Sequence, residues 1–155
     1  MTLSIAIAGA AGRMGRALIR AACVDSRFTV AGGTERSEGQ FLGADLGALA
    51  GISPLFMMTT EVADHAAENA QVWIDFTTPA ATLDALAALK NTSTRAAIVG
   101  TTGFTLAEDA QLIAHSKRIA IVRSGNFSLG MVKKFFFVSG NILHADAADV
   151  IYSCR

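Results

Sequence analysis

The stretch that decides the fold is LSIAIAGAAGRMG, residues 3–15, in which a short apolar run leads directly into a glycine-rich turn and then into helix-forming sequence. Gly9 allows a tight turn out of a strand, Gly12 lets backbone N–H groups approach a pyrophosphate, and Gly15 lets the helix pack closely on the strand. A helix that starts near Arg13 would direct its N-terminal N–H groups at the phosphates. The spacing is G-x-x-G-x-x-G, and a glycine-rich turn can also merely connect a strand to a helix. This stretch alone therefore leaves both interpretations open.

An acidic residue follows the second apolar run, residues 28–31, at the distance that a dinucleotide site requires. Glu35 lies about 20 residues beyond Gly15, where a carboxylate accepts hydrogen bonds from the adenosine ribose. Arg36 beside it can pair with a 2′-phosphate or stack on adenine, so the pair predicts use of both NADH and NADPH. The alternative is a solvated charge pair in a loop, and the preceding glycine turn favours the binding site.

Composition is that of one globular nucleotide-binding domain. The chain has 155 residues, of which 52% are hydrophobic and 17% charged, so it can bury one substantial core. The net charge of zero and the scattered Lys and Arg residues argue against nucleic acid and against an anionic membrane surface as partners. No apolar run reaches the length of a membrane span, and the two cysteines and three histidines form no metal-binding pattern. We therefore expect a cytoplasmic protein without a metal.

Short apolar runs alternate with stretches of helical period, which predicts an α/β fold, a Rossmann-type doubly wound parallel sheet. Thr78-Pro79 is an N-cap followed by proline at the first helical position, and Thr105 with Glu108 forms a capping box. The predicted strands are 3–8, 28–32, 72–76, 96–99 and 119–123; the predicted helices, besides the one near Arg13, are 60–69, 80–89 and 105–116, and 40–56 is expected to be an irregular loop.

Three turns follow the third, fourth and fifth predicted strands, at residues 75–79, 100–104 and 124–127. The ligand crevice of an open parallel sheet forms at the carboxyl ends of its strands, where all three turns should lie. Their small, hydroxyl and amide residues could hold a nicotinamide and its ribose. Each turn taken singly is more often a simple connection, but three at one edge opposite a pyrophosphate turn favour a binding role.

The motifs resemble one family closely, the dihydrodipicolinate reductases, which are NAD(P)H-dependent enzymes of the diaminopimelate route to lysine. The likeness covers about residues 3–130 and rests on IAIAGAAGRMGRALI, Glu35-Arg36, WIDFTTPAATL, VGTTGF and SGNFSLG, in the family's order. It implies hydride transfer from NADH or NADPH to a cyclic imine-type dicarboxylate. It also implies that Thr102 touches the substrate, and that the cofactor is held by Gly9, Ala10, Ala11, Gly12, Arg13, Met14, Glu35, Arg36, Gly100, Thr101, Thr102, Ser124, Gly125, Asn126 and Phe127.

The resemblance ends near residue 130, so we divide the chain into a dinucleotide-binding domain, 1–130, and a divergent helix and strand, 131–155. In the family a second domain carries an E-x-H-H-x-x-K catalytic segment and a P-S-G-T-A substrate loop, and it also builds a homotetramer. Neither motif occurs in this sequence. The chain thus carries no catalytic residue of the family, and we expect it to be inactive alone. Two explanations of the missing segment stay open. Either the chain is cut just before the catalytic segment, or its reading frame was altered near Met131. In the tail, helical spacing joins Val132, Phe135, Phe136, Ser139, Ile142 and Leu143, and 149–152 could be a strand.

A rival interpretation is a nucleotide-binding module without catalysis, such as a redox sensor or a CoA-binding domain. A CoA domain has no need of Glu35, and a sensor has no need of the turns at 100–104 and Asn126 that would position a reactive nicotinamide. These features favour the reductase.

Overall fold

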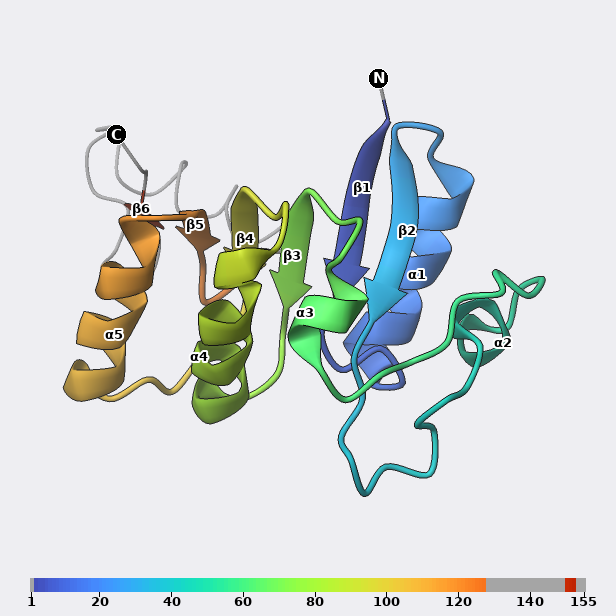
Figure 1. Cartoon of the computed structure of the whole chain (residues 1–155), viewed down its shortest axis with the longest axis horizontal. Helices are drawn as coiled ribbons and strands as arrows, with labels where there is room; N and C mark the ends of the chain where they lie inside the picture. Colours follow the sequence, from blue (N-terminus) through green and yellow to red (C-terminus); the bar gives the residue numbers. More distant parts are fainter. Residues whose placement is uncertain (1, 128–149, 153–155) are drawn as a thin grey trace, which may run out of the picture.

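The computed structural model describes residues 2–127 and 150–152, and it places them in one six-stranded sheet with helices on both faces (Figure 1). The strand order is β2-β1-β3-β4-β5-β6. The strands are β1 (Leu3–Ile7), β2 (Phe28–Gly33), β3 (Val72–Asp75), β4 (Ala96–Val99), β5 (Ala120–Arg123) and β6 (Val150–Tyr152). The helices are α1 (Arg13–Val24), α2 (Leu46–Ala50), α3 (Ala63–Ala66), α4 (Pro79–Ala88), the 3₁₀ turn η1 (Leu89–Asn91) and α5 (Leu106–Ser116).

The sheet confirms the predicted doubly wound topology. Strands β1 to β5 pair in parallel, and β6 pairs antiparallel with β5 at the edge. The chain adds β2 on one side of β1 and then β3, β4 and β5 on the other, so the order reverses between β1 and β3. Ligands of such sheets bind outside the carboxyl ends of the strands at this reversal. In Figure 1 the arrowheads of β1, β2 and β3 point to that edge, at the bottom of the view.

All five predicted parallel strands are confirmed, each within one residue at either end. The strands β3 and β4 alternate between fully buried and partly buried residues, because successive side chains point to opposite faces of the sheet. Trp73 and Ala97 point to the face that is fully covered, whereas Ile74 and Ile98 are partly buried on the other face. Both faces are apolar, as expected for a parallel sheet between helical layers.

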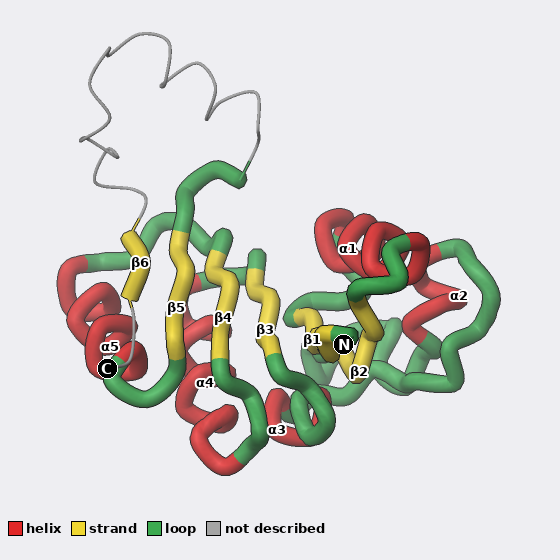
Figure 2. Tube along the Cα trace, turned by 90° about the horizontal axis from the view of Figure 1, so that it is seen from above, coloured by secondary structure: helices red, strands yellow, loops and turns green. Residues whose placement is uncertain are grey.

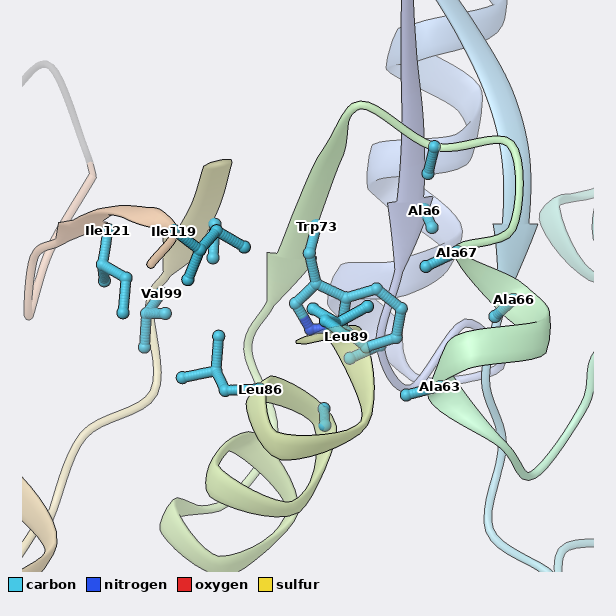
Figure 3. Close-up of a cluster of buried hydrophobic side chains, with 14 of the residues drawn as sticks. Ala6, Ala63, Ala66, Ala67, Trp73, Leu86, Leu89, Val99, Ile119 and Ile121 are labelled. Carbon is cyan, nitrogen blue, oxygen red and sulfur yellow. The ribbon is translucent and has the colours of Figure 1, made fainter. Parts of the chain in front are cut away.

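Two apolar clusters fill the space between sheet and helices. One lies under α3, α4 and α5 and contains Trp73, which Figure 3 shows in the same cluster as Leu86, Leu89 and the alanines of α3. The other lies under α1 and α2 and contains Ile7, Ile19 and Leu46. Burying a Leu or Ile side chain fully stabilises the fold by roughly 1.5–3 kcal/mol. Figure 2, seen from above, shows α1 and α2 on one face and α3, α4 and α5 on the other.

The caps predicted for α4 and α5 are present in the structure, and α1 starts at Arg13 as predicted. Gly12 is the N-cap of α1, and the Thr78 hydroxyl accepts from the Ala81 N–H ahead of α4. At α5 the Thr105 hydroxyl accepts from the Glu108 N–H while the Glu108 carboxylate accepts from the Thr105 N–H at 2.7 Å. That backbone N–H lowers the pKa of Glu108. All three helices therefore start at the carboxyl edge of the sheet.

The helix predicted over 60–69 is wrong outside Ala63–Ala66. Thr60 is extended, because its N–H donates to the Gly33 carbonyl at 3.1 Å and its carbonyl accepts from the Glu35 N–H at 2.9 Å. At the other end the Gln71 N–H donates to the Ser4 carbonyl, which commits the chain to the sheet. Pairing with β1 and the β2 end thus overrides the helical propensity of the alanine-rich segment.

The irregular loop predicted over 40–56 is wrong at Leu46–Ala50, which form α2. The Asp45 carboxylate caps this helix by accepting from the Ala48 N–H at 2.9 Å, which lowers the pKa of Asp45. Gly51 ends the helix in the left-handed conformation at φ +73°. Both signals stand in the sequence, as Asp45 ahead of an apolar run and Gly51 after it.

The strand expected at 149–152 is confirmed for Val150–Tyr152. Its first residue, Asp149, and the helical pattern from Val132 to Leu143 lie outside the described residues. Within the described residues no helix combines the length and the apolar character needed to cross a bilayer.

Candidate functional site

The glycine turn lies between β1 and α1 at the reversal of strand order. Gly9 adopts φ +60°, which favours glycine, and the Gly12 N–H donates to the Gly9 carbonyl at 2.9 Å to close the turn. The Ala10 N–H donates to the Thr34 carbonyl at 2.8 Å, which ties the turn to the end of β2. Gly12 is exposed, and the first N–H groups of α1 beyond it lack carbonyl partners within the helix. This is the geometry of an anion site at a helix N-terminus.

Gly15 has the packing role expected of it. A Cβ at this position would lie 2.6 Å from the Ala10 carbonyl oxygen and 2.7 Å from the Ala10 Cα, distances that backbone atoms cannot accommodate. A Cβ at Gly12 would lie 3.1 Å from the Gly9 carbonyl oxygen, which is tight but not prohibitive. Gly15 is thus needed by the fold, whereas Gly12 leaves open space in front of the helix.

A pocket of about 480 Å³ lies in front of the turn. Its walls are Ala8, Gly9, Gly12, Arg13, Met14, Gly15, Ala17, Leu18 and Phe76. Four residues predicted to hold the cofactor, Gly9, Gly12, Arg13 and Met14, therefore meet in one cavity. Ala10 and Ala11 belong to the same turn without lining the pocket, and Ala10 is fully buried.

Phe76 is a wall residue that the sequence analysis placed in one of the three turns but not among the predicted cofactor contacts. It follows β3, on the far side of the reversal from the glycine turn, and its ring packs edge-to-face on Phe127 with centroids 5.7 Å apart. It also lies against Gly100, where a Cβ would come 2.7 Å from the Phe76 Cζ atom. The signal that could have found it was its place in one of the three turns at the carboxyl edge.

Glu35 and Arg36 lie just beyond β2. They follow Thr34, whose carbonyl accepts a hydrogen bond from the glycine turn at Ala10. The Glu35 Oε1 atom accepts from the Arg36 N–H at 3.0 Å, and the Glu35 side chain is only 10% exposed. The Arg36 side chain is 92% exposed, with its Nε 3.8 Å from Glu35 Oε1. The carboxylate is thus held in place by its own turn, while the guanidinium that pairs with it is exposed to solvent.

The turns after β4 and β5 lie at the same edge. The Gly100 N–H donates to the Asp75 carbonyl at 2.8 Å, and the Ser124 N–H donates to the Val99 carbonyl at 3.2 Å. The Ser124 hydroxyl bonds both the carbonyl and the N–H of Asn126, at 2.9 and 3.2 Å. Backbone hydrogen bonds therefore connect the start of each turn to the end of the neighbouring strand.

The hydroxyl residues of the β4 turn have opposite orientations. Thr101 is 2% exposed, whereas Thr102 and Gly103 are exposed, and Gly103 has φ +84°. Thr102 is the residue expected to touch the substrate. Its exposure at the carboxyl edge is compatible with that role, but it is outside the pocket in front of the glycine turn.

Arg123 anchors the end of β5. Its guanidinium pairs with the Asp109 carboxylate at 2.5 Å and lies 4.6 Å from the centre of the Phe104 ring. The ion pair joins the strand to α5, and the ring contact joins it to the β4 turn. Arg123 is only 18% exposed, so these contacts are partly shielded from solvent.

Of the two histidines in the described part, His115 lies away from this edge. His115 is in the last turn of α5, which starts at the carboxyl edge and runs away from it, and burial together with Arg118 lowers the pKa of His115. His65 is in α3. Over residues 2–127 and 150–152 no cluster of His, Cys, Asp or Glu could hold a metal ion.

Comparison with known proteins identifies this arrangement. The family model described as "Dihydrodipicolinate reductase, N-terminus" matches residues 3–127. The 4-hydroxy-tetrahydrodipicolinate reductase of Parvibaculum lavamentivorans is 40% identical over 130 residues, covering 83% of this chain and 48% of the relative. That of Beijerinckia indica is 39% identical over 154 residues, covering 96% of this chain and 56% of the relative. The chain spans about half the length of these curated relatives.

A solved structure has the same fold. It is the dipicolinate-bound dihydrodipicolinate reductase from Paenisporosarcina sp. TG-14, with a TM-score of 0.67 and 18% identity, covering 88% of this chain and 52% of that one. The motif resemblance, the family match and the glycine turn at the strand reversal all lead to one assignment. The chain belongs to the dihydrodipicolinate reductase family and corresponds to its N-terminal part.

Proposed function

We propose that this chain is the cofactor-binding half of a dihydrodipicolinate reductase and holds NADH or NADPH along the carboxyl edge of its sheet. The observation that carries the proposal is the glycine turn at the β1/β3 reversal, with exposed Gly12 capping α1 above a pocket of about 480 Å³. Backbone N–H groups and the helix dipole there suit a pyrophosphate. The residues from Gly9 to Met14 would hold it.

The adenosine end of the cofactor would lie toward Glu35 and Arg36. The preset carboxylate of Glu35 would accept from the ribose hydroxyls, while exposed Arg36 would pair with a 2′-phosphate or stack on adenine. This division of roles supports use of both NADH and NADPH.

The nicotinamide end would lie toward the other turns, held by Gly100, Thr101 and Thr102 and by Ser124, Gly125, Asn126 and Phe127. A bound reduced nicotinamide supplies a hydride, and the chain's own contribution is to bind and orient that ring. In the whole protein the acceptor would be a cyclic dicarboxylate of the diaminopimelate route to lysine, contacted by Thr102. The acid for protonation would come from outside this chain, and a cytoplasmic homotetramer without nucleic-acid or membrane partners is the expected setting.

The competing proposal is a nucleotide-binding module without catalysis. Every observation that fits such a module also fits the reductase. A CoA-binding domain would use the glycine turn but not Glu35, which this structure holds in place by a hydrogen bond to its own turn.

Binding can be followed through Trp73, the single tryptophan of the chain, because tryptophan emission overlaps the absorption of reduced nicotinamide. We expect NADPH and NADH to quench Trp73 emission saturably and calorimetry to give the same dissociation constants, whereas coenzyme A should leave the emission unchanged. Binding of coenzyme A in preference to both dinucleotides would overturn the proposal.

A further inference from the structure

The Asp75 carboxyl group is fully buried at the end of β3, and every hydrogen bond that the structure describes for it is one that it accepts. Its Oδ1 atom accepts from the Thr77 N–H at 2.9 Å, the Thr77 hydroxyl at 2.6 Å and the Thr101 hydroxyl at 3.2 Å. Its Oδ2 atom accepts from the Trp73 indole N–H at 3.3 Å. A buried polar group of this kind must be satisfied, so its partners are held to it firmly.

The network extends through Thr101 to α4. The Thr101 hydroxyl accepts from the Thr82 hydroxyl at 2.9 Å and from the Thr77 N–H at 3.1 Å. Thr82 and Thr101 are buried, at 0% and 2% exposure. The hydroxyl of Thr101 is therefore used within the protein and points away from any ligand on the surface of the turn.

The network joins the turn after β3, whose Phe76 lines the pocket, to the turn after β4. Phe76, a pocket wall, lies between Asp75 and Thr77, both of which belong to the network, and its ring packs on Gly100 beside Thr101. Strand β4 neighbours β3, so one carboxyl group can set both turns at once. Moving the Asp75 carboxyl or the Thr101 hydroxyl would shift Phe76 relative to the glycine turn.

We propose that Asp75 is a positioning residue for the nicotinamide end of the cofactor, acting through the Thr77 and Thr101 hydroxyls to set Phe76 and the turn at 100–102. The inference rests on the proposed dinucleotide function. It assigns Thr101 an indirect role, in which the side chain holds the turn and only its backbone faces the ligand.

The test compares two ligands and two matched valine variants. NADPH would contact the whole edge, whereas 2′-phospho-ADP-ribose lacks the nicotinamide and would contact only the glycine turn and the Glu35–Arg36 region. Thr101→Val removes the hydroxyl of the network. Thr94→Val is the control, because Thr94 is also buried and its hydroxyl also bonds within the protein, to the Ala70 carbonyl at 3.1 Å, but it precedes β4 at the opposite edge.

We expect Thr101→Val to weaken NADPH about tenfold, the effect of about 1.4 kcal/mol, and 2′-phospho-ADP-ribose less than about twofold. Thr101→Ser, which keeps the hydroxyl, should restore NADPH binding, and Thr94→Val should bind both ligands like the parent. Asp75→Asn should weaken NADPH binding in the same selective way and shift Trp73 emission. Asparagine has a single accepting oxygen, so either the Thr77 and Thr101 side or the Trp73 side of the network loses its acceptor.

Equal effects of Thr101→Val on the two ligands, or no effect on either, would overturn the inference while leaving the proposed function intact. So would a Thr101→Val protein that fails to fold while Thr101→Ser folds and still binds NADPH weakly. If the parent chain binds neither ligand, the proposed function falls first and the inference falls with it.

Discussion

The ring of Phe76 occupies the space that a side chain at Gly100 would fill, so the turn after β3 and the turn after β4 can approach only because residue 100 has no Cβ. A Cβ there would lie 2.7 Å from the Phe76 Cζ atom. The pairing joins a pocket wall to a turn predicted to hold the nicotinamide. It brings together two residues 24 positions apart in the sequence, on neighbouring strands.

We predict that Gly100→Ala destabilises the chain by about 1–3 kcal/mol, the usual result of overpacking, and weakens NADPH binding. Adding Phe76→Leu should recover part of the stability by making room. Urea unfolding of the two single variants and the double variant measures this as a double-mutant cycle. Additive losses, with no recovery in the double variant, would contradict the contact.

Gly12 and Gly15 should separate binding from folding. Gly12→Val places a branched side chain in front of α1 where the pyrophosphate would lie, so NADH binding should fall by more than about tenfold in a folded protein. Gly15→Ala should instead unfold or strongly destabilise the chain, because its Cβ meets the Ala10 backbone at 2.6 Å. Calorimetry with NADH and urea unfolding of both variants check this. Equal NADH binding by folded Gly12→Val and the parent would exclude the site.

Arg36 and Glu35 should discriminate between the two cofactors. Arg36→Ala should weaken NADPH by roughly 1.5–3 kcal/mol, the cost of a lost charge-assisted hydrogen bond, with a much smaller effect on NADH. Because Arg36 is 92% exposed, the loss should not alter stability. Glu35→Ala should weaken NADH more than NADPH. Titrations with both cofactors decide, and parallel losses in Arg36→Ala would mean that the arginine contacts only the adenine.

Acid should remove one local contribution to stability near the start of β2. The Arg27 side chain, which donates to the Asp25 carboxylate at 2.6 Å, lowers the pKa of Asp25 from 3.8 to about 2. A lowered pKa in the folded state stabilises it above pH 3.8, and this contribution disappears as the pH falls toward about 2. Asp25→Asn should therefore be less stable than the parent above pH 3.8, and the difference should shrink in acid. A difference independent of pH would contradict the ion pair.

We predict that the 155-residue protein binds NADPH without reducing dihydrodipicolinate. Turnover requires a proton donor near the nicotinamide, and His115 lies toward the opposite edge with a pKa lowered by burial and by Arg118. His144 and Lys133 lie outside the described residues. Oxidation of NADPH followed with fresh substrate is the assay. Turnover in the common enzyme range of about 1–10³ s⁻¹ would contradict the prediction.

Local signals in the sequence determined most of the fold. The β1–α1 turn, the Thr78-Pro79 start of α4 and the capping box at Thr105 are short-range chemistry, so each is readable from neighbouring residues and each is present in the structure. The alanine-rich segment around Ala63–Ala66 shows where this fails. Its propensity favours a longer helix. Thr60, however, pairs with Thr34 at the end of β2, so the helix cannot begin there, and this constraint comes from a distant strand.

The pocket was determined only in part by the sequence. Gly9, Gly12, Arg13 and Met14 lie within one short segment, so the sequence, read together with Glu35 and the later turns, predicts a site at the first turn. The roles of Phe76 and of buried Asp75 depend on which strands are neighbours, because their partners Gly100 and Thr101 follow a different strand. Strand order and side-chain direction set those contacts, and both are products of tertiary packing.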